Sequence, residues 1–542
     1  MSVRKGFVLL AAVSMLLFLA ACGGNNNGIA TPTAPSSGSF STSSLNGAYV
    51  FAVSGFDVDG DSYSMAGTFT ANGSGGITGG TVDINDPGEF TSPVADATIS
   101  GSSSYSVTVD GRGQTQINVS GISGFPAVNL DFVLSSSSAG QVTEIDNFGT
   151  GTGTLDAQTA SVTPSGAYAF SLSGAAGSGT LATAGNFTVG SGGAISSGLE
   201  DFNDNGVLAS TAESLTGSVV VSSSAPSTTL ITSSYPNLTF DVFPISASHL
   251  KFIEMDSNAL MLGDAFSQTS TTIPTGTLPF TLLGDVSTNV PFAAGGFFVT
   301  DGNGNLTSSS SEDFNEGGTL SPSGSASFAG TYTAGGTGRY TFNLSSFTGG
   351  STYAAYPSSG GVLLLDIDAA AGIVTTGAAY GPQSSTATLE TGEGYGLSLA
   401  GYNVPDAALV YDTGEFATAS SGNTISSGAI DEGFISSSGI GSAYGVPLTS
   451  GTYTSPSGGR GQIVATASSS NGNNATLNGG LTLIYYVVDG TTFPFIEYDA
   501  TQISAGIFVL QNPSSSAAAV ASPHDMFIPR APLHPSAKPK KK

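Results

Sequence analysis

Three short acidic segments carry the residue types that a hard cation needs. Each places an aspartate two residues before an asparagine, and a second acid and a glycine follow closely. Carboxylate and amide oxygens at such spacing can coordinate calcium, so calcium is the ion that these segments suggest. The candidate ligands are Asp83, Asn85, Asp86, Asp201, Asn203, Asp204, Asp313, Asn315 and Glu316. The alternative is an ordinary turn, because the same residue types favour turns and no complete calcium-loop spacing is present.

A second acidic pattern consists of two acids separated by one residue within a strand-like run. The pairs are Glu144 and Asp146, Glu254 and Asp256, Asp366 and Asp368, and Glu497 and Asp499. This spacing places both carboxylates on one face of a strand, and we expect that face to be exposed to solvent. Glycoside cleavage needs two carboxylates on opposite sides of a bond, roughly 5 to 10 Å apart, which neighbours on one face do not provide. The chain also has no Trp to stack on a sugar, so the pattern argues against a glycosidase.

Cations are rare enough to be informative. Between the N-terminal segment and the C-terminal tail only four lysines or arginines occur: Arg112, Lys251, Arg339 and Arg460. The three arginines follow a glycine in matching turn-like segments. We predict that all four are structural counter-ions for nearby carboxylates. The alternative is a solvated turn residue, because exposed ion pairs contribute only ~0 to 1 kcal/mol.

Histidine is too scarce for the common hydrolytic sites. His249 is the only histidine away from the tail, and we expect it at the edge of a strand. A repeated Ser-His or metal-His centre is therefore excluded. We predict no enzymatic activity and no cofactor besides the candidate calcium.

These residues recur because the chain contains four copies of one unit. The segment Gly47–Gly55 returns at 166–174 and, more loosely, at 276–284 and 393–401. The fourth unit keeps the acidic segment only as Asp431-Glu432-Gly433, whereas Asp301-Gly-Asn303-Gly-Asn305 of the third unit predicts a hairpin turn. The predicted domains are a signal peptide (1–21), a Gly/Asn/Ser/Pro-rich tether (22–44), four β repeats (45–160, 161–272, 273–387 and 388–515) and a disordered basic tail (516–542).

Each repeat is expected to be entirely β, with no significant helix outside the signal peptide. Apolar and polar residues alternate over about eight short runs bounded by Gly, Asn, Asp and Ser. In the first repeat the last of these runs is 140–156. Eight sequential antiparallel strands can close into a small up-and-down barrel, which leaves no exposed sheet edge. A β-sandwich is the alternative, because both folds have one buried and one wet face per strand.

The N-terminus carries an export signal. Arg4 and Lys5 precede an apolar run that ends in Leu19-Ala20-Ala21-Cys22, which resembles the lipobox of bacterial lipoproteins. The resemblance implies cleavage before Cys22, the only cysteine, and a diacylglyceryl group with palmitate-type chains on its thiol. An ordinary signal peptide is the alternative. Gly23 replaces the Asp that commonly retains such lipoproteins in the inner membrane, so the resemblance favours the outer membrane.

The composition limits the classes of molecule that the chain can bind. A net charge of -27 repels phosphate backbones, so nucleic acid is not expected. Charged residues make up 9% of the chain and glycine numbers 76, so hydroxyl and amide groups must cover much of the surface. The sequence thus predicts a non-catalytic, lipid-anchored envelope protein, a structural or adhesive array of tandem repeats. The alternative is a binding protein whose barrels each hold a small apolar ligand. The basic tail either contacts anionic lipid or is a solvated end.

Overall fold

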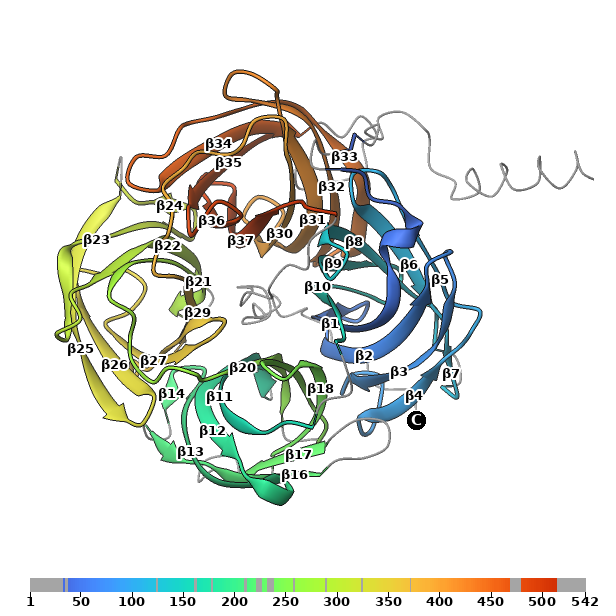
Figure 1. Cartoon of the computed structure of the whole chain (residues 1–542), viewed down its shortest axis with the longest axis horizontal. Coiled ribbons are helices and arrows are strands. Elements are labelled where there is room, and N and C mark those ends of the chain that lie inside the picture. Colours follow the sequence, from blue (N-terminus) through green and yellow to red (C-terminus); the bar gives the residue numbers. More distant parts are fainter. Residues whose placement is uncertain are drawn as a thin grey trace, which may run out of the picture.

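The computed structural model shows four antiparallel β-barrels arranged in a ring (Figure 1). The prediction of an all-β chain of up-and-down barrels is confirmed, and the only helical elements described are two single 3-10 turns, η2 (Thr42–Ser44) and η3 (Ser191–Gly193). Cys22 and the basic tail lie outside the described residues. The structure describes residues 33–34 and 38–513, apart from 123–124, 160–162, 177–178, 209–211, 221–226, 232–237, 257–258, 288–289, 323–324, 371 and 468–478.

Barrels 1 and 2 use the first half of the chain. The strands of barrel 1 are β1 (Asn46–Asp57), β2 (Ser62–Asn72), β3 (Ile77–Asn85), β5 (Ser104–Val107), β6 (Arg112–Ile117), β8 (Val128–Ser136), β9 (Ala139–Ile145) and β10 (Gly149–Ala157), with β4 (Val94–Ile99) and β7 (Val119–Ser120) beside them. Those of barrel 2 are β11 (Gly166–Ala176), β12 (Gly179–Val189), β13 (Ala194–Asp204), β16 (Thr216–Val220), β17 (Ser227–Ile231), β18 (Leu238–Ser246), β19 (His249–Glu254) and β20 (Leu260–Ser267), with β14 (Val207–Leu208) and β15 (Glu213–Ser214) beside them.

Barrels 3 and 4 repeat the pattern. Barrel 3 consists of β21 (Gly276–Ser287), β22 (Val290–Thr300), β23 (Asn305–Glu316), β25 (Ala326–Gly336), β26 (Arg339–Ser345), β27 (Thr352–Ser358), β28 (Gly361–Asp366) and β29 (Ile373–Ala379), with β24 (Thr319–Leu320) beside them. Barrel 4 consists of β30 (Gly394–Asn403), β31 (Ala408–Thr418), β32 (Thr424–Ser436), β33 (Gly439–Tyr453), β34 (Arg460–Ala467), β35 (Gly479–Tyr486), β36 (Thr492–Glu497) and β37 (Gln502–Leu510).

All four units close, although not in the same way. In barrel 4 the last strand, β37, pairs with the first, β30, along its whole length. Barrels 2 and 3 close through β12–β13 and β22–β23. Barrel 1 closes through two backbone bonds between the segments of β3 and β5, from Ile77 N to Ser103 O at 3.0 Å and from Tyr105 N to Gly75 O at 2.9 Å. Closure pairs nearly all edges of the described strands, which leaves few backbone groups free to pair with another chain.

Local chemistry sets the turns between strands. The side chain of Asp301 accepts the backbone N–H groups of Asn303 (2.7 Å) and Asn305 (3.0 Å), which confirms the predicted hairpin turn between β22 and β23. The run expected at 140–156 is two strands, because Asp146 accepts the N–H groups of Phe148 and Gly149 and turns the chain there. Eight strands per barrel still hold in barrel 1, since β4 lies outside its closed circuit.

Apolar and aromatic side chains fill each barrel. Every barrel has its own buried cluster, and ring pairs such as Phe280–Phe298 in barrel 3 (4.2 Å between centroids) and Phe493–Phe508 in barrel 4 (4.9 Å) occupy the interior. Phe40, within the predicted tether, is 1% exposed and belongs to the barrel 1 cluster. The tether therefore ends earlier than residue 44.

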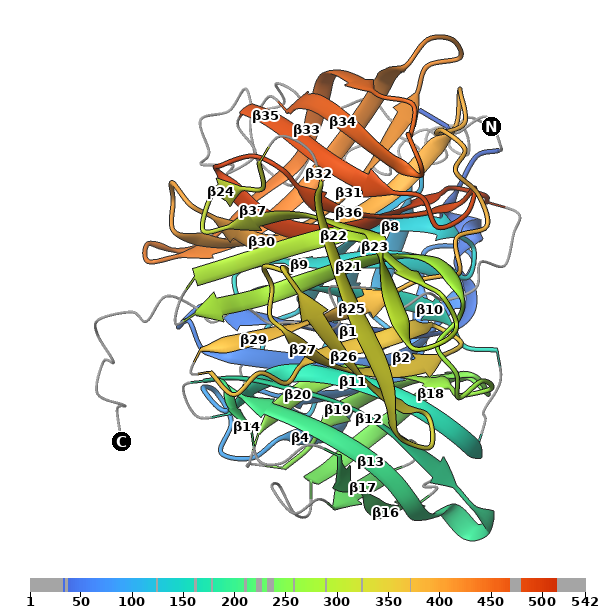
Figure 2. The same ribbon diagram turned by 90° about the vertical axis from the view of Figure 1, so that its left-hand side faces the viewer.

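The barrels also pack against one another. Strands that face the centre are buried on both sides: β31 is buried at every residue, and β1 at its last nine. Outer strands such as β5 and β34 alternate between buried and exposed residues. The expectation of one wet face per strand is thus wrong for the inner strands, because neighbouring barrels cover it. In side view, β21 and β22 run roughly along the axis of the ring (Figure 2).

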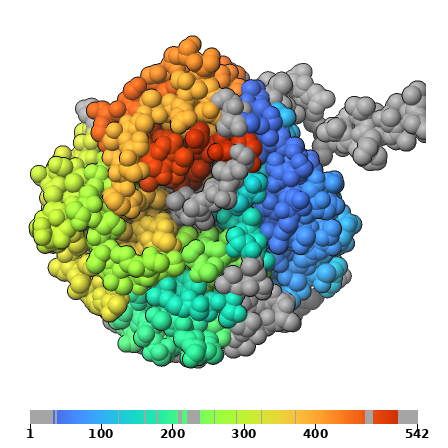
Figure 3. Space-filling model, in the orientation of Figure 1, coloured from blue at the N-terminus to red at the C-terminus, as the bar shows by residue number. Residues whose placement is uncertain are grey.

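The four tandem repeats close into a ring (Figure 1). Barrels 1 and 4, which are far apart in the sequence, lie side by side and complete a closed outline (Figures 1 and 3). Gln511 Nε2 donates to the carbonyl oxygens of Asp110 (2.7 Å) and Leu134 (2.9 Å), and Asn512 N donates to Ser135 O (2.8 Å). Among the described residues, no helix is long and apolar enough to span a membrane.

Candidate functional site at the junctions between barrels

The predicted calcium ligands lie where one barrel meets the next. The three acidic segments are the ends of β3, β13 and β23. In each, the middle apolar residue (Ile84, Phe202 or Phe314) packs with its own barrel's core. Alternation along the strand then directs the aspartate and the asparagine outward, toward the neighbouring barrel.

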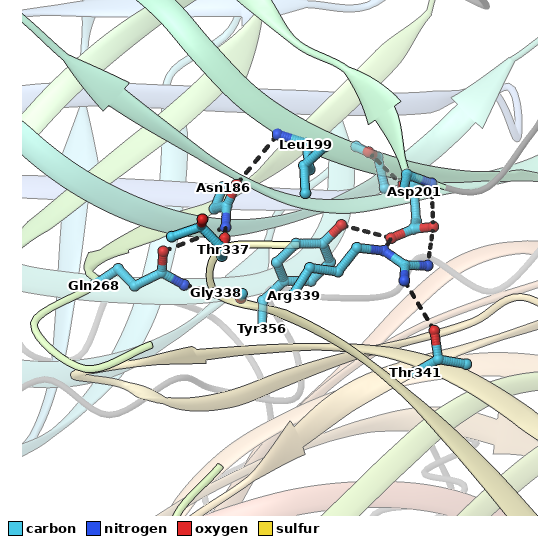
Figure 4. A network of polar contacts seen from close by, with 11 residues as sticks. Asn186, Leu199, Asp201, Gln268, Thr337, Gly338, Arg339, Thr341 and Tyr356 are labelled. Carbon is cyan, nitrogen blue, oxygen red and sulfur yellow. Dashed lines mark hydrogen bonds and ion pairs between the residues drawn. The ribbon is translucent and has the colours of Figure 1, made fainter. Parts of the chain in front are cut away.

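At the junction of barrels 2 and 3, the carboxylate is that of Asp201 (Figure 4). Arg339 of barrel 3 donates from Nε to Oδ2 at 2.6 Å and from Nη2 to Oδ1 at 2.7 Å. The hydroxyl of Tyr356 donates to Oδ2 at 2.5 Å, and Arg339 also reaches Thr341 Oγ1 at 2.9 Å. The Arg339 side chain is only 4% exposed, so this is a buried, bidentate pair of the strong kind.

The junction of barrels 3 and 4 repeats this arrangement. Arg460 donates to both oxygens of Asp313 at 2.8 Å, and Tyr486 donates to Oδ2 at 2.8 Å. The Arg460 side chain is 28% exposed, which leaves this pair more hydrated than the pair at Asp201. Register explains the shared tyrosine, because Arg460 is paired across the sheet with Tyr486.

The junction of barrels 4 and 1 has a looser version. Arg112 Nε donates to Asp110 Oδ2 of its own barrel at 3.1 Å, whereas its Nη1 lies 3.9 Å from Asp431 Oδ1 of barrel 4. Burial raises the pKa of Asp431, and Arg112 opposes that rise. Burial also raises the pKa of Asp131, and the nearby Asp431 adds to the effect.

The junction of barrels 1 and 2 brings two acids together. Asp83 is 1% exposed, and its environment includes Asp241 of barrel 2. Burial, and then the charge of Asp241, raise the pKa of Asp83 to about 8 against the opposing hydrogen bond from Asp96 N. Lys251 Nζ lies 2.8 Å from Asp264 Oδ2 of its own barrel. Burial raises the pKa of Asp156 of barrel 1, and His249 and Lys251 of barrel 2 oppose that rise.

His249 and Lys251 converge on Asp264. His249 Nε2 lies 2.6 Å from Asp264 Oδ1, and the imidazole stacks on Phe266 with 4.5 Å between ring centroids. Burial opposes ionisation of Asp264, but Lys251 and His249 hold its pKa below the usual range. His249 is the first residue of β19, as a strand-edge histidine should be, yet it is buried and bonded.

The asparagines of the acidic segments join the barrels through the backbone. Asn85 Nδ2 donates to the carbonyl oxygen and the carboxylate of Glu254, both at 2.9 Å. Asn203 Nδ2 donates to the carbonyls of Asp366 and Ile373, and Asn315 Nδ2 to those of Asp499 and Gln502, all between 2.7 and 3.0 Å. In the fourth unit the position is Gly433, where a Cβ would lie 2.2 Å from Thr150 Oγ1 of barrel 1.

The remaining calcium candidates behave as turn residues. Asp86 accepts the N–H groups of Gly88 and Glu89, while Asp204 and Glu316 end their strands. The oxygens of Asp201 and Asp313 are already bonded to arginine and tyrosine. Among the described residues, no group of three or more His, Cys, Asp or Glu side chains could hold a metal ion.

The acid pairs are not on a solvent-exposed face, which corrects the expectation. The first acid of each pair, Glu144, Glu254, Asp366 or Glu497, is at most 2% exposed. Burial raises the pKa of all four, in Glu254 to about 10. Burial therefore favours the neutral form of all four, and the Glu144 carboxyl accepts a hydrogen bond from the Tyr63 hydroxyl.

The second acid of each pair accepts backbone N–H groups, Asp256 that of Thr239 and Asp368 that of Ser351. Asp146 accepts the N–H groups of Phe148 and Gly149, and Asp499 those of Thr501 (2.9 Å) and Gln502 (3.1 Å). Because one acid is buried and its partner is bonded to backbone N–H groups, neither is placed to cleave a glycosidic bond.

Tyr356, Tyr486 and Asp241 are junction residues that the sequence did not single out. The available signal was positional: barrels 3 and 4 have Tyr356 and Tyr486 where barrels 1 and 2 have Val133 and Phe243. That signal has meaning only once the register of the following strand is known.

No protein-family model matches the chain, and no curated protein matches it. Among solved structures, transferrin binding protein B from serogroup B Neisseria meningitidis is 12% identical, with 69% of this chain and 84% of that chain covered and a TM-score of 0.20. Transferrin binding protein B from Haemophilus parasuis is 8% identical, with 90% and 98% covered and a TM-score of 0.17. TM-scores this low support no conclusion about function.

Proposed function

We propose that the chain is a lipid-anchored, non-catalytic protein of the cell envelope, in which the ring is a structural or adhesive body. The observation that carries the proposal is that the cationic side chains of the repeats are bonded to carboxylates of the chain itself. The four cations of the repeats, Arg112, Lys251, Arg339 and Arg460, all bond to carboxylates at buried or half-buried positions. Side chains that could otherwise bind or activate a substrate hold strands and barrels together.

The outer strands leave a surface suited to many weak contacts. Ser104 and Ser106 on β5, and Gln114 and Gln116 on β6, point outward and are exposed. Asn343 and Ser345 on β26 do the same in barrel 3, among the outermost strands of the ring (Figure 1). Hydroxyl and amide groups can each donate and accept hydrogen bonds, and their repetition around a ring favours multivalent attachment.

The alternative, a small apolar ligand inside each barrel, needs an open interior. The described interiors are occupied by packed rings instead. Two cavities of about 620 Å³ lie elsewhere: one at the junction of barrels 3 and 4, lined by Val290, Glu316, Tyr402 and Ile503, and one beside residues 40–43. Packing of the interiors favours the structural or adhesive function.

Anchoring is tested through Cys22. Two or three acyl chains would hold the protein on a membrane, since each buried methylene contributes ~0.8 kcal/mol. In a bacterial host, we expect the full chain to sediment with the outer-membrane fraction and to incorporate radiolabelled palmitate. The variant Cys22→Ser should lose the label and move to the soluble fraction. A labelled Cys22→Ser protein, or a wild-type protein found only in the soluble fraction, would contradict the anchor.

Adhesion is tested on whole cells. Cells that display the wild-type chain should attach to hydroxylated surfaces more than cells that express Cys22→Ser, and protease added outside should remove both the protein and the attachment. Equal attachment of the two strains would favour a purely structural role inside the envelope.

A further inference from the structure

The cavity of about 620 Å³ where barrel 3 meets barrel 4 is built from both barrels. Barrel 3 contributes the start of β22 and the turn between β23 and β24, and barrel 4 contributes β30, the turn that follows it, and β37 (Figure 1). Its volume falls within the range of about 300 to 1,000 Å³ that is usual for sites of small molecules. We propose that this cavity binds a small amphiphilic amine, that is, a molecule with an apolar body and one ammonium group.

Most side chains of the lining are apolar. They are Val290 and Pro291 from barrel 3, and Val404 and Ile503 from barrel 4. Val404 is 37% exposed, although it is a large apolar side chain. An apolar ligand that covers this surface removes it from water, which favours binding. The lining therefore selects a ligand with an apolar body.

The charge of the lining comes from one carboxylate. Glu316, at the end of β23, is half-buried and is the charged residue among those that line the cavity. Arg460, the cation of this junction, donates to both oxygens of Asp313 instead, and no ion pair in the described part of the chain neutralises Glu316. A carboxylate beside an apolar wall favours a ligand with one positive charge. Tyr402 adds an aromatic ring to the lining, and the face of such a ring attracts cations.

A glycine keeps the cavity open. Gly317 lines the cavity with a left-handed φ of 55°, and its N–H donates to Pro291 O at 2.9 Å. At the junction of barrels 2 and 3, Asn205 N donates in the same way to Thr180 O at 2.8 Å, and the φ of Asn205 is 51°. The side chain of Asn205 occupies the space beside Gly179. Because glycine has no side chain, the corresponding space beside Gly317 is open to a ligand.

A fluorine NMR titration of the full chain with 4-fluorophenethylamine at pH 7 tests the proposal. We expect the fluorine resonance to broaden and shift until the site is saturated. The neutral analogue 2-(4-fluorophenyl)ethanol has the same apolar body without the ammonium group, so its dissociation constant should be about tenfold higher. The proposal is overturned if the amine shows no saturable binding, or if the amine and the alcohol bind equally well.

Substitutions in the lining locate the bound amine. Glu316→Gln keeps the shape of the side chain and removes its charge, so the dissociation constant should rise about tenfold. The matched control is Glu89→Gln, which removes the same charge at an exposed position of barrel 1 and should leave the affinity unchanged. Gly317→Asn introduces the residue that the preceding junction has at this φ, and it should fill the cavity and weaken binding about tenfold.

Two results with these variants contradict the assignment. One is an equal change in affinity for Glu316→Gln and Glu89→Gln, which would show that the amine responds only to the net charge of the chain. The other is wild-type affinity in a Gly317→Asn protein that keeps the wild-type melting temperature.

Discussion

Burial makes the junction carboxylates depend on their partners. A carboxylate removed from water loses several kcal/mol of hydration, and a bidentate arginine with a tyrosine hydroxyl restores much of that loss. Asp201 and Asp313 receive both, whereas Asp83 lies beside Asp241 and accepts the backbone N–H of Asp96. One residue type at one repeat position therefore lies beside an arginine at two junctions and beside a second acid at a third.

The first prediction concerns the arginines. Arg339→Ala should lower the free energy of unfolding by about 3 kcal/mol, because Asp201 is left buried without a counter-charge. Arg460→Ala should cost about 1 kcal/mol, since its side chain is 28% exposed and water can hydrate Asp313 after the change. Urea denaturation followed by tyrosine fluorescence measures both.

Arg112→Ala, at the junction of barrels 4 and 1, should lower the free energy of unfolding by less than Arg339→Ala does. Equal effects for Arg339→Ala and a neutral change on an outer strand, such as Gln116→Ala, would show that the ion pairs contribute nothing.

At the level of strands, the end of the third long strand of each repeat is the part that docks on the next barrel. The segments at β3, β13 and β23 place an asparagine on backbone carbonyls of the neighbour, and β32 places Gly433 there. Among these four junctions, only that of barrels 4 and 1 has a glycine in place of the asparagine, and there the backbone of one barrel lies close to the next barrel.

The second prediction follows from this approach. Gly433→Ala should lower the free energy of unfolding by about 2 kcal/mol, because its Cβ would lie 2.2 Å from Thr150 Oγ1. Thr150→Ala in the same chain should recover part of the loss, as measured by a double-mutant cycle. Gly480→Ala is the matched control, since a Cβ there has no neighbour within 4 Å. Additive effects of the two substitutions would contradict direct contact.

Strands and barrels were predictable because their signals are local. Apolar and polar residues alternate within runs of about eight residues, and the same landmarks recur once per unit, so both signals can be read directly from the sequence. The pairing of β30 with β37 agrees with the closed barrel that these signals predicted. The junctions were not predictable, because Arg339 and Asp201 lie 138 residues apart and meet only after both barrels close. The prediction that the acid pairs face solvent was wrong because alternation does not show which side of a strand is buried. Glu254 lies in an alternating run, but its carboxyl points to the side that the barrel buries.

At the scale of the whole molecule, buried acids set the response to pH. Burial raises the pKa of Glu254 to about 10, of Asp83 and Glu415 to about 8, and of Asp57, Glu200 and Glu312 to about 7. The folded chain therefore binds more protons than the unfolded chain between about pH 4 and these values. Under that condition stability falls as pH rises, by up to ~1.4 kcal/mol per pH unit for each proton.

The third prediction is a melting temperature that is highest near pH 5 and falls through pH 7 and 9, as recorded by calorimetry. Glu254→Gln should flatten the fall between pH 7 and 9, because it removes the group with the highest pKa value given above. Below about pH 4 the trend should reverse, because the unfolded chain then binds a proton at Asp264 that the folded chain, in which the pKa of Asp264 is lowered, does not. A melting temperature that rises from pH 5 to 9 would contradict the neutral state of these acids.

The meeting of the first and last barrels decides how an attached ring would be oriented. Residues 511–512 bond to barrel 1, so both described ends of the chain leave the ring at the junction of barrels 4 and 1. In a ring of four, the junction of barrels 2 and 3 lies diametrically opposite (Figure 1). A ring attached through its N-terminal side would therefore be held at the junction of barrels 4 and 1. The junction of barrels 2 and 3, with the buried Asp201–Arg339 pair, would be the part of the ring farthest from the attachment point.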